Sequence, residues 1–489
     1  MADPQALAPH VLVFPLPLQG PVKAMLKLTE LLCLVGIQVT FLVTDHILGR
    51  LLRHTDIQSH FARYAGFRLV AISDGLADDH PRLADQFMEL MGGLKAVTMP
   101  LFREKLASGG FCPDSRPPVT CVIADGMLGF AIEVSKEIGL PIICSTTISP
   151  CFLWVIFCLP ELIEAGELPI GEKDLDGLIT IVPGMEGVLR RRDLPSFCRS
   201  GKPTDPNIQL YLAESKITLQ TDGLILNSFE DLEGPVLAHI RSLCPNLYTI
   251  GPLYAHLKSR LAEASAPSSF CTSSFRQEDR SCLTWLDQQP EKCVIYVSFG
   301  SLVPMTTNQL MEFWHGLVNA DHRFLWVIRP DSLGGREERQ DQIPPELREG
   351  TEARGYIVEW APQEEVLAHR AVAAFLTHSG WNSTLESVYE GVPMICWPYF
   401  VDQQVNSRYV DVVWKLGLDM KDTCDRAVIE RTVKDLMDVR KSEFRESADG
   451  MASLARKSVM PGGSSWRDLD RLVKDIRSTS LSGSQGQSC

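Results

Sequence analysis

Apolar residues in the first half of the chain gather in short continuous runs that alternate with segments of helical spacing. The run "HVLVFP" (10–15) is followed by leucines at helical spacing between 26 and 32 and then by "IQVTFLV" (37–43). Two further runs occupy 119–125 and 140–146. Runs that are apolar throughout are typical of parallel strands covered on both faces. The pattern therefore predicts recurring strand, helix, strand units, as in a doubly wound α/β sheet.

The second half repeats this alternation after a break. The stretch 254–281 is rich in Ser, lacks apolar periodicity and predicts a linker with an exposed loop. A second α/β series follows, with elements predicted at 292–301, 307–319, 324–330, 356–362, 373–380 and 393–399. We expect two successive doubly wound halves with a cleft between them, and ligands beyond the carboxyl ends of the strands.

The predicted boundaries are a first domain at 1–253, the linker at 254–281, a second domain at 282–460 and a C-terminal part at 461–489. The last part contains one amphipathic helix, "SSWRDLDRLVKDI", before a Ser- and Gly-rich end that we expect to be disordered. A chain of 489 residues exceeds the size at which one hydrophobic core keeps growing. Length therefore also favours two domains.

Charge and cysteine usage exclude several classes of protein. A formal net charge of −14 opposes binding to nucleic acid or to anionic lipid. The 14 cysteines are scattered without a CxxC pair, which predicts neither a zinc site nor a disulfide framework and favours a reducing, cytoplasmic setting. The apolar stretch 141–160 carries polar residues and Pro150, and so favours a buried strand followed by a core helix over a membrane span.

One segment, 360–403, has residues suited to binding a phosphate. After its apolar run at 373–377, "HSGWNST" predicts a tight turn that opens a helix. Free N–H groups and the positive end of the helix dipole attract a phosphate at such a turn. His378 can add a donor, Ser383 can add a hydroxyl, and the turn at 300–301 can form a second cradle.

Other side chains of the segment suit a base and two sugars. Trp360 offers a flat face to a base, and Glu386, one turn into the helix, can accept from ribose hydroxyls. Asp402 and Gln403 follow another strand and offer acceptors and an amide to sugar hydroxyls. Each residue taken singly also fits a structural role, such as a core tryptophan or a helix-end histidine. The spacing of the whole set favours a nucleotide-sugar site.

At its full 44 residues the segment resembles the signature of the plant secondary-product (family 1) UDP-glycosyltransferases. "FPLPLQG", "NSFEDLE" and "VSFGS" resemble the same family. The resemblance implies a GT-B fold: two Rossmann-like domains with parallel sheets face a central cleft, and the C-terminal helix returns to the first domain. The first domain would bind the acceptor and the second the UDP-sugar. The resemblance also implies a cytoplasmic monomer with UDP-glucose as co-substrate and no metal or other cofactor.

The resemblance further implies roles for individual residues of the donor site. Trp360 would stack on uracil, while Gln363 and Glu386 would hold the ribose. The remaining donor-site residues would be Ser301, His378, Asn382 and Ser383 at the diphosphate, Trp381, Asp402 and Gln403 at the sugar, and Ala361 and Gly380 beside them. Glutamine at the last position of the segment, here Gln403, is typical of family members that use a glucose donor. Ser379 stands where the family commonly has cysteine, a departure that should leave donor binding intact.

The catalytic positions match the family only in part. The family inverts the anomeric carbon, with a histidine in a QGH turn as the base and an aspartate to orient it. Asp125 in "VIADG" matches the aspartate, but Pro21 takes the histidine's place, at what we predict to be the first helical position. Three explanations stay open. In the first, the acceptor is acidic enough to need no base. In the second, Asp125 or another residue, such as His46, acts as the base. In the third, the chain binds donor with little transfer.

The N-terminal half also resembles a particular branch of the family. "HTDIQSHFARYAGFRLVAISDGLADDHPR" and "LPLQGPVKAMLKLTELL" are similar to the 7-deoxyloganetic acid glucosyltransferase-like branch, whose acceptors are iridoids and other small terpenoids. This implies transfer to a hydroxyl, hemiacetal or carboxyl oxygen. We expect an acceptor pocket formed by Leu16, Leu18, Met127, Phe130, Phe152, Trp154 and Phe400. The basic run at 190–197 could meet an acceptor carboxylate, although a solvated loop edge is the favoured interpretation.

Overall fold

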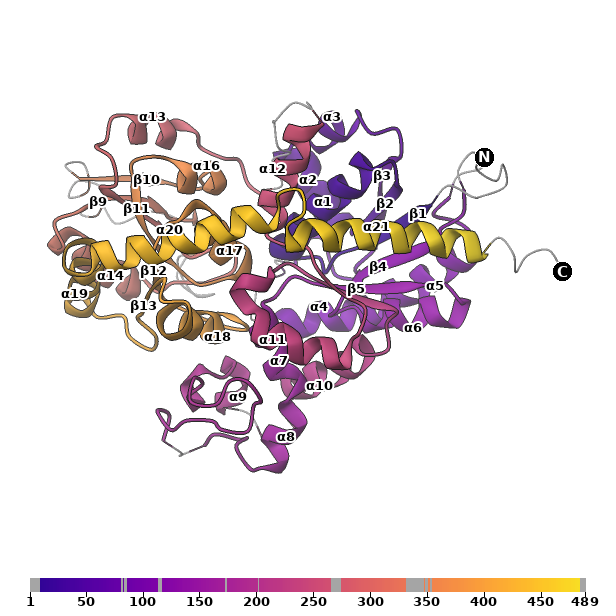
Figure 1. Ribbon diagram of the computed structural model, residues 1–489, viewed down its shortest axis with the longest axis horizontal. Helices are drawn as coiled ribbons and strands as arrows, with labels where there is room; N and C mark the ends of the chain where they lie inside the picture. Colours follow the sequence, from indigo (N-terminus) through magenta and orange to yellow (C-terminus); the bar gives the residue numbers. More distant parts are fainter. Residues whose placement is uncertain are drawn as a thin grey trace. The chain divides into compact units, whose positions relative to one another are not determined.

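The chain forms two compact units in the computed structural model (Figure 1). Unit 1 consists of Met1–Pro160, Thr204–Arg276 and Lys457–Cys489, and unit 2 of Glu161–Pro203 and Gln277–Arg456. The structure describes residues 9–80, 82, 86–112, 117–171, 174–200, 202–264, 274–330, 347, 351 and 354–483. The expected disordered end at 484–489 lies outside the described residues.

Unit 1 is built on a sheet with the strand order β3-β2-β1-β4-β5-β6-β7, in which all pairings are parallel. The strands are β1 (His10–Phe14), β2 (Gln38–Thr44), β3 (Phe67–Ile72), β4 (Cys121–Asp125), β5 (Ile142–Thr146), β6 (Gly223–Leu226) and β7 (Leu247–Thr249). The chain builds outward from β1 in one direction and from β4 in the other. Loops after these two adjacent strands therefore meet at a switch point, where doubly wound sheets bind ligands.

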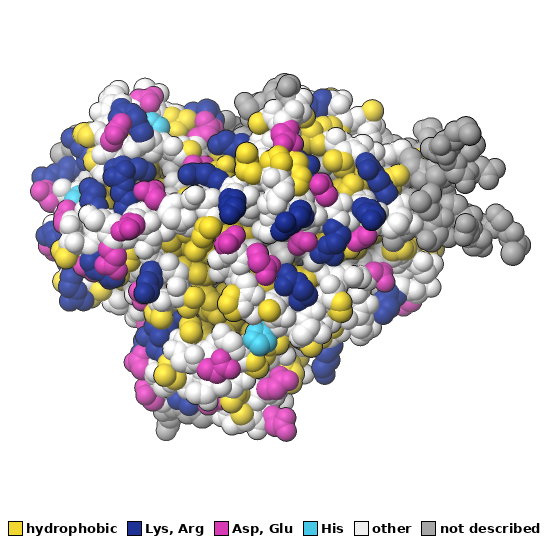
Figure 2. All heavy atoms as spheres, viewed as in Figure 1, with side chains coloured by type: hydrophobic (Ala, Val, Ile, Leu, Met, Phe, Trp, Pro, Cys, Tyr) yellow, Lys and Arg dark blue, Asp and Glu magenta, His cyan; other side chains and the backbone are white. Residues whose placement is uncertain are grey.

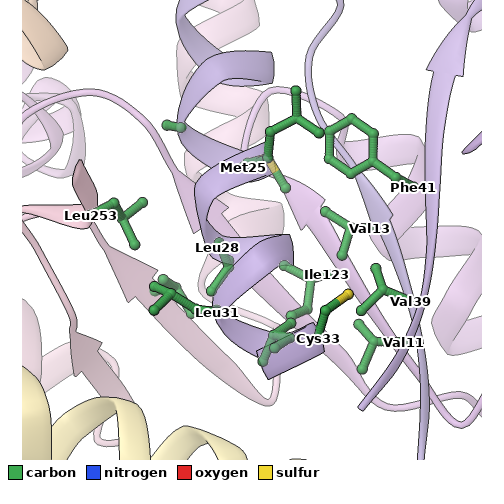
Figure 3. Close-up of a cluster of buried hydrophobic side chains, with 14 of the residues drawn as sticks. Val11, Val13, Met25, Leu28, Leu31, Cys33, Val39, Phe41, Ile123 and Leu253 are labelled. Carbon is green, nitrogen blue, oxygen red and sulfur yellow. The ribbon is translucent and has the colours of Figure 1, made fainter. Parts of the chain in front are cut away.

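Helices cover both faces of this sheet, because alternate strand residues point to opposite sides. Val11 and Val13 pack in one apolar layer with Leu28 (Figure 3), and Leu12 packs in the other layer with Phe102. The helices are α1 (Gln19–Leu34), α2 (Asp45–His54), α3 (Ile57–Phe61), α4 (Phe87–Gly93), η2 (Leu94–Thr98), α5 (Met99–Ala107), α6 (Gly129–Ile138), α7 (Pro150–Phe157), α10 (Pro206–Thr218), α11 (Glu230–Leu243), α12 (Leu253–Glu263) and α21 (Ser464–Gly483).

Unit 2 repeats this design with the strand order β10-β9-β8-β11-β12-β13, again with parallel pairings. Its strands are β8 (Val294–Ser298), β9 (Arg323–Val327), β10 (Gly355–Val358), β11 (Val372–Thr377), β12 (Met394–Cys396) and β13 (Gly417–Asp419). Ile295, Phe324 and Trp326 pack in one apolar layer with Phe313 of α14 (Thr307–Asn319) and Ile429 of α19 (Arg426–Lys434). The switch point of this sheet lies between β8 and β11.

The helices of unit 2 and of its boundaries complete the fold. They are α8 (Leu159–Glu164), η3 (Arg191–Asp193), α9 (Ser196–Ser200), α13 (Ser281–Asp287), α14 (Thr307–Asn319), α16 (Gln363–Ala368), α17 (Trp381–Glu390), α18 (Gln403–Arg408), η5 (Tyr409–Val413), α19 (Arg426–Lys434), η6 (Asp435–Val439) and α20 (Lys441–Ser458). Helices and parallel strands alternate in both units, as the sequence predicts.

Part of the predicted linker at 254–281 is helical instead. Tyr254 lies in α12, whose Leu257 and Leu261 are buried in the apolar layer of unit 1, and Phe275 is buried in the same layer. The prediction was wrong here because Leu253, Leu257 and Leu261 recur at helical spacing and are all buried, a period that the Ser-rich sequence after them obscures. Residues 265–273, the centre of the predicted linker, lie outside the described residues.

Two segments belong to a different unit from the residues that precede them in the sequence. Residues 161–203 belong to unit 2, although they lie within the predicted first domain. The C-terminal residues from Lys457 belong to unit 1, where Asp468 of α21 accepts from the Thr249 N–H at 2.8 Å and Asp475 accepts from the Tyr248 hydroxyl at 2.7 Å. Long-range contacts decide both memberships, and local periodicity contains no information on them.

The stretch 141–160 forms a strand, β5, and then a buried helix, α7, as predicted. In the described ranges, no helix combines the length and the apolar character needed to cross a bilayer. On the face drawn in Figure 2, basic and acidic side chains are interspersed rather than gathered into one basic area.

Candidate active site

The switch point of unit 2 brings the two predicted phosphate turns together. Ser298 of β8 pairs with Thr377 of β11, so the turn after β8, Gly300 and Ser301, lies beside the turn after β11, which begins with His378. Both turns follow the carboxyl ends of their strands. The structure therefore places these residues at one edge of one sheet, where the sequence predicts a diphosphate site.

His378 fits between two glycines. A Cβ atom on Gly300 would lie 2.5 Å from His378 Nε2, and one on Gly380 would lie 2.4 Å from the same atom. Gly300 also has a φ of +72°, which side chains other than glycine rarely adopt. The ring of His378 therefore contacts the backbone on both sides, and its position depends on the absence of both side chains.

His378 is electrically neutral at neutral pH. Burial, together with the nearby Arg329 guanidinium, lowers its pKa to about 4. Its Nδ1 atom is buried and has no hydrogen-bond partner in the part of the chain that the structure describes. A neutral imidazole carries one N–H group. His378 is therefore suited to donate one hydrogen bond to a phosphate oxygen rather than to act as a cation.

Arg329 is a site residue that the sequence reasoning missed. Its guanidinium donates to the Ser301 carbonyl at 2.7 Å and to the Val303 carbonyl, and only 5% of the residue is exposed. It holds the turn after β8 and supplies positive charge near His378. The signal was present in "FLWVIRP", where an arginine directly follows a buried apolar run at the carboxyl end of a strand.

The turn at 378–380 opens a helix in the predicted way. Gly380 is the N-cap of α17 and carries no side chain to cap the helix, so the helix presents the positive end of its dipole at this turn. Ser379, just before, has a φ of +64°, an uncommon conformation that is often kept at functional sites. The expected phosphate donors at 380–382 thus share one end of one helix.

A set of polar side chains lies one turn further along α17. The Gln363 side-chain amide donates to Ser383 Oγ at 2.9 Å and to Glu386 Oε2 at 2.8 Å. Gln363 Oε1 accepts from the Tyr296 hydroxyl at 3.3 Å. Glu386 is 3% exposed, so these bonds fix its orientation. The structure brings the three predicted residues together, and Trp360 and Ala361 lie just before Gln363 in the chain.

The predicted sugar residues begin α18. Gln403 Oε1 accepts from the N–H groups of Tyr399 and Phe400 at 2.8 and 3.1 Å, so the NH₂ of Gln403 is the group left for a ligand. Asn406 donates to Asp402 Oδ2 at 3.0 Å and to the Ser379 carbonyl at 2.9 Å. Asn406, which the sequence analysis did not identify, thus connects the start of α18 to the phosphate turn.

Asp125 lies at the switch point of unit 1. It ends β4, its Oδ1 accepts from the Met127 N–H at 3.0 Å, and it is 4% exposed. Burial raises its pKa to about 6, although hydrogen bonds from Met127, Leu16 and Thr147 act in the opposite direction. Asp125 is therefore a buried carboxyl group that titrates near neutral pH, which is typical of groups at functional sites.

Pro21 lies deeper in its helix than predicted. α1 begins at Gln19, so Pro21 is the third helical residue and not the first. The first helical hydrogen bond runs from the Val22 N–H to the Leu18 carbonyl at 3.1 Å. The missing N–H of a proline at position 21 therefore costs no helical hydrogen bond, just as it would at the first position.

His46 is not next to Asp125 in the sheet. It lies in α2, after β2, and β1 separates β2 from β4. Adjacent strands are about 4.8 Å apart, which puts these two strands about 10 Å apart. Burial and then the charges of Arg82 and Arg50 lower the pKa of His46 to about 4. His46 therefore lies among cations and not beside the Asp125 carboxylate.

The apolar residues predicted for the acceptor pocket differ in burial. Leu16 and Phe130 are buried in the apolar layer of unit 1 next to Asp125, while Met127 and Leu18 are partly exposed at its edge. The others form separate contacts: Phe152 is completely buried against Tyr211, Trp154 stacks on His239, and Phe400 of unit 2 packs on Tyr399. Complete burial is typical of a core residue, so Phe152 is the weakest member of the set.

The basic run at 190–197 is engaged in ion pairs. Arg190 pairs with Asp193, Arg191 with Glu167 at 2.8 Å, and Arg192 with Asp176 at 2.7 Å. These contacts neutralise the arginines within unit 2. They favour a structural role for these arginines at the edge of a loop over binding of an acceptor carboxylate.

Comparison with known proteins identifies the family. The family model "UDP-glucoronosyl and UDP-glucosyl transferase" matches residues 271–455. A 7-deoxyloganetic acid glucosyltransferase of Catharanthus roseus is 54% identical over 473 residues, 96% of this chain and 98% of that protein. A myricetin 3-O-rhamnoside 1,2-glucosyltransferase of Crocosmia x crocosmiiflora is 42% identical over 475 residues, 96% of either chain.

A solved structure agrees with this result. The crystal structure of Os79 from O. sativa in complex with UDP has a TM-score of 0.79 at 29% identity, over 95% of this chain and 100% of that chain. Two Rossmann-like domains with parallel sheets define a GT-B fold. The chain belongs to the family of UDP-glucuronosyl and UDP-glucosyl transferases, within plant family 1, and is a UDP-glycosyltransferase.

Replacing Gly380 with alanine should weaken UDP binding. The new methyl group would collide with His378 Nε2 and displace the ring, and φ at this position is an ordinary −63°. We expect affinity for UDP to fall about ten- to a hundredfold, the effect of losing one hydrogen bond to a charged group. Gly450→Ala is the matched control, since a Cβ there meets nothing within 4 Å. Equal UDP affinity of the two variants in calorimetry would contradict the role of His378.

Proposed function

We propose that the chain transfers glucose from UDP-glucose to an acidic oxygen of a small terpenoid or iridoid, with inversion at C1 and without a histidine base. The proposal depends on Pro21 together with a relative, 54% identical, that is named for an acid, 7-deoxyloganetic acid. A carboxyl group has an ordinary pKa of about 4 and is ionised at neutral pH. Such an acceptor brings a deprotonated oxygen, so it needs no base at position 21.

In this proposal unit 2 holds the donor. Gln363 and Glu386 bind the ribose and fix its orientation. The amide of Gln403 binds the sugar. The acceptor oxygen attacks C1, the bond from C1 to the UDP oxygen breaks, and UDP leaves with the electron pair. Negative charge then develops on the diphosphate. His378, the first N–H groups of α17 and the charge of Arg329 stabilise that charge where it forms.

Asp125 has a different role for each kind of acceptor, and pH distinguishes them. An ionised Asp125 repels an acceptor carboxylate, so kcat/KM with an acid should fall as pH rises through the pKa of about 6. If Asp125 is instead the base for a neutral hydroxyl, kcat/KM should rise through the same pH. Asp125→Asn should retain activity with an acid, whereas loss of a base would cost about 10²- to 10⁴-fold.

The function itself is tested by incubating the purified protein with UDP-glucose and a panel of terpenoid acids, hemiacetals and phenols. Formation of a glucoside of an acid with release of UDP is the expected result. The alternative is a nucleotide-sugar-binding protein of the same fold with little transfer. Donor binding in calorimetry without product from any acceptor of a broad panel would favour that alternative.

The proposal has UDP-glucose as co-substrate and no resident metal or other cofactor. The diphosphate interacts with neutral donors and with Arg329, which supply the stabilisation that a divalent cation supplies in other phosphate sites. Activity should therefore be unchanged after dialysis against EDTA and should not increase on addition of Mg²⁺ or Mn²⁺. A rate that is lost in EDTA and restored by one of these ions would contradict this part of the proposal.

A further inference from the structure

Segment 161–203 contacts the rest of unit 2 through a buried carboxylate. Asp193 ends η3 and is 0% exposed. Arg190 closes the turn, since its backbone N–H, Nε and Nη2 donate to the Asp193 carboxylate at 2.8, 2.9 and 2.9 Å. Burial alone would raise the pKa of Asp193, but Arg190 and Lys421 hold it below its ordinary value. Asp193 is therefore an ionised group held by cations.

One of these cations comes from the second half of the sequence. Lys421 Nζ lies 2.7 Å from Asp193 Oδ1 and 3.0 Å from Asp419 Oδ2. The same Nζ donates to the Gln404 carbonyl at 3.0 Å. An ammonium group has three donors, and all three have an acceptor here. The Lys421 side chain is 2% exposed, so removing the Asp193 charge would leave this buried cation with one of its two carboxylate partners, Asp419.

A second cation connects the same carboxylate to the other end of α18. Arg408 Nε lies 3.4 Å from Asp193 Oδ2 and donates to the Val188 carbonyl at 2.8 Å. Gln404 lies in the first turn of α18, and Arg408 is its last residue. Segment 161–203 thus contacts α18 directly at Arg408 and, through Lys421, at Gln404. α18 continues directly into η5, but the helical segment Gln403–Val413 is still short, so outside contacts determine its position.

The polar side chains expected at the donor sugar move with this helix. Asp402 is the N-cap of α18, and Gln403 is its first residue. Their side chains are oriented by bonds to Asn406 within the helix and to the turn at 399–400 just before it. A displacement of α18 would therefore displace both groups, whereas the ribose cluster on α16 and α17 has its own bonds.

We propose that Asp193 is a positioning residue for the donor sugar, because its carboxylate fixes α18 and thereby the orientation of Asp402 and Gln403. The inference rests on the proposed function in one respect, that these two residues bind the sugar of UDP-glucose. Asp193 itself is fully buried and does not contact the donor in this scheme. It acts on selectivity for the sugar rather than on binding of the UDP part.

The test compares Asp193→Asn with wild type in calorimetry, with UDP, UDP-glucose and UDP-galactose and no acceptor. UDP-galactose differs from UDP-glucose only in the orientation of the C4 hydroxyl. We expect the preference for UDP-glucose over UDP-galactose to fall about five- to tenfold, the effect of one misplaced hydrogen bond. Affinity for UDP alone should stay at the wild-type value. A wild-type sugar preference in Asp193→Asn would overturn the inference.

Glu167→Gln is the matched control. Glu167 pairs with Arg191 in the same segment at 2.8 Å, without a contact to α18 among those described. The control variant also loses one ion pair of segment 161–203, but it should keep the wild-type sugar preference. An equal loss of preference in both variants would show a general effect of loosening the segment and would overturn the role of Asp193.

A double variant keeps the test decisive if Asp193→Asn does not fold. Asp193→Asn with Lys421→Met removes this buried pair, a change that is often tolerated, and leaves Asp419 with Arg190, whose Nη2 lies 3.6 Å from Asp419 Oδ2. It should lose the sugar preference in the same way, and an unchanged preference would overturn the inference. The experiment measures binding in the absence of acceptor, so its result does not depend on glucose transfer. It therefore separates the role of Asp193 from the proposed function. A protein with a sugar preference that depends on Asp193 but no transfer would contradict only the proposed function.

Discussion

Pro21→His should increase activity with phenols and alcohols by about 10²- to 10⁴-fold, the usual contribution of a general base. Position 21 precedes the first helical hydrogen bond, so a histidine there, with its N–H, fits the helix as well as proline does. Asp125 ends the neighbouring strand and is available to orient the new imidazole. Acids should gain little, because they already present an ionised oxygen. Initial rates at saturating UDP-glucose measure the effect.

The pattern across acceptors decides the interpretation of Pro21. A gain confined to weakly acidic acceptors supports a natural acceptor that needs no base. Equal gains on acids, phenols and alcohols would contradict that account. Pro21→Ala is the control, since it restores the N–H without adding a base and should leave all rates close to those of wild type.

Relative to wild type, Asp125→Asn should gain about 2 kcal/mol of unfolding free energy between pH 4.5 and pH 8. The pKa of Asp125 is raised from 3.8 to about 6 in the folded state, so the folded state binds its proton more tightly than the unfolded state. Its contribution to stability is therefore present below pH 3.8 and is lost as pH rises through about 6. Asparagine does not titrate, so the variant does not lose this stability as pH rises.

Urea unfolding of both proteins at the two pH values gives this difference directly. The effects of all other titrating groups are common to both proteins and cancel. The Met127 N–H keeps an acceptor in the asparagine side chain, so the local turn is preserved. The same difference at both pH values would mean that burial does not raise the pKa of Asp125.

Strands within clear apolar runs could be predicted, including the three-residue β12 in the run 393–399, and strands without such a run could not. The runs at 10–15, 37–43, 119–125 and 140–146 correspond to β1, β2, β4 and β5. The strands that were missed have weak signals. β3 is mostly half-exposed and contains Arg68, and β7 and β13 have three residues each. Such strands gain their structure from a neighbour in the sheet, and their own sequence does not show the pairing.

The residues of the donor site were predictable as a set, because one segment of 44 residues contains most of them and the two phosphate turns follow adjacent strands. Residues that act through three-dimensional contacts were not. Arg329 and Asp193 are buried charges that are stabilised by partners distant in the sequence. A sequence shows that such a residue is charged, but it does not show whether it meets solvent or a partner in the fold.

The division of the chain between the units also determines when each unit can complete its folding. Unit 1 needs residues from Lys457 onward, and unit 2 needs residues 161–203. During translation, α21 is synthesised after almost all of the rest of the chain. Unit 1 can therefore complete its fold only when α21 has emerged from the ribosome and packs on β7. A gene cut at residue 253 would encode two fragments, and neither would contain a complete unit.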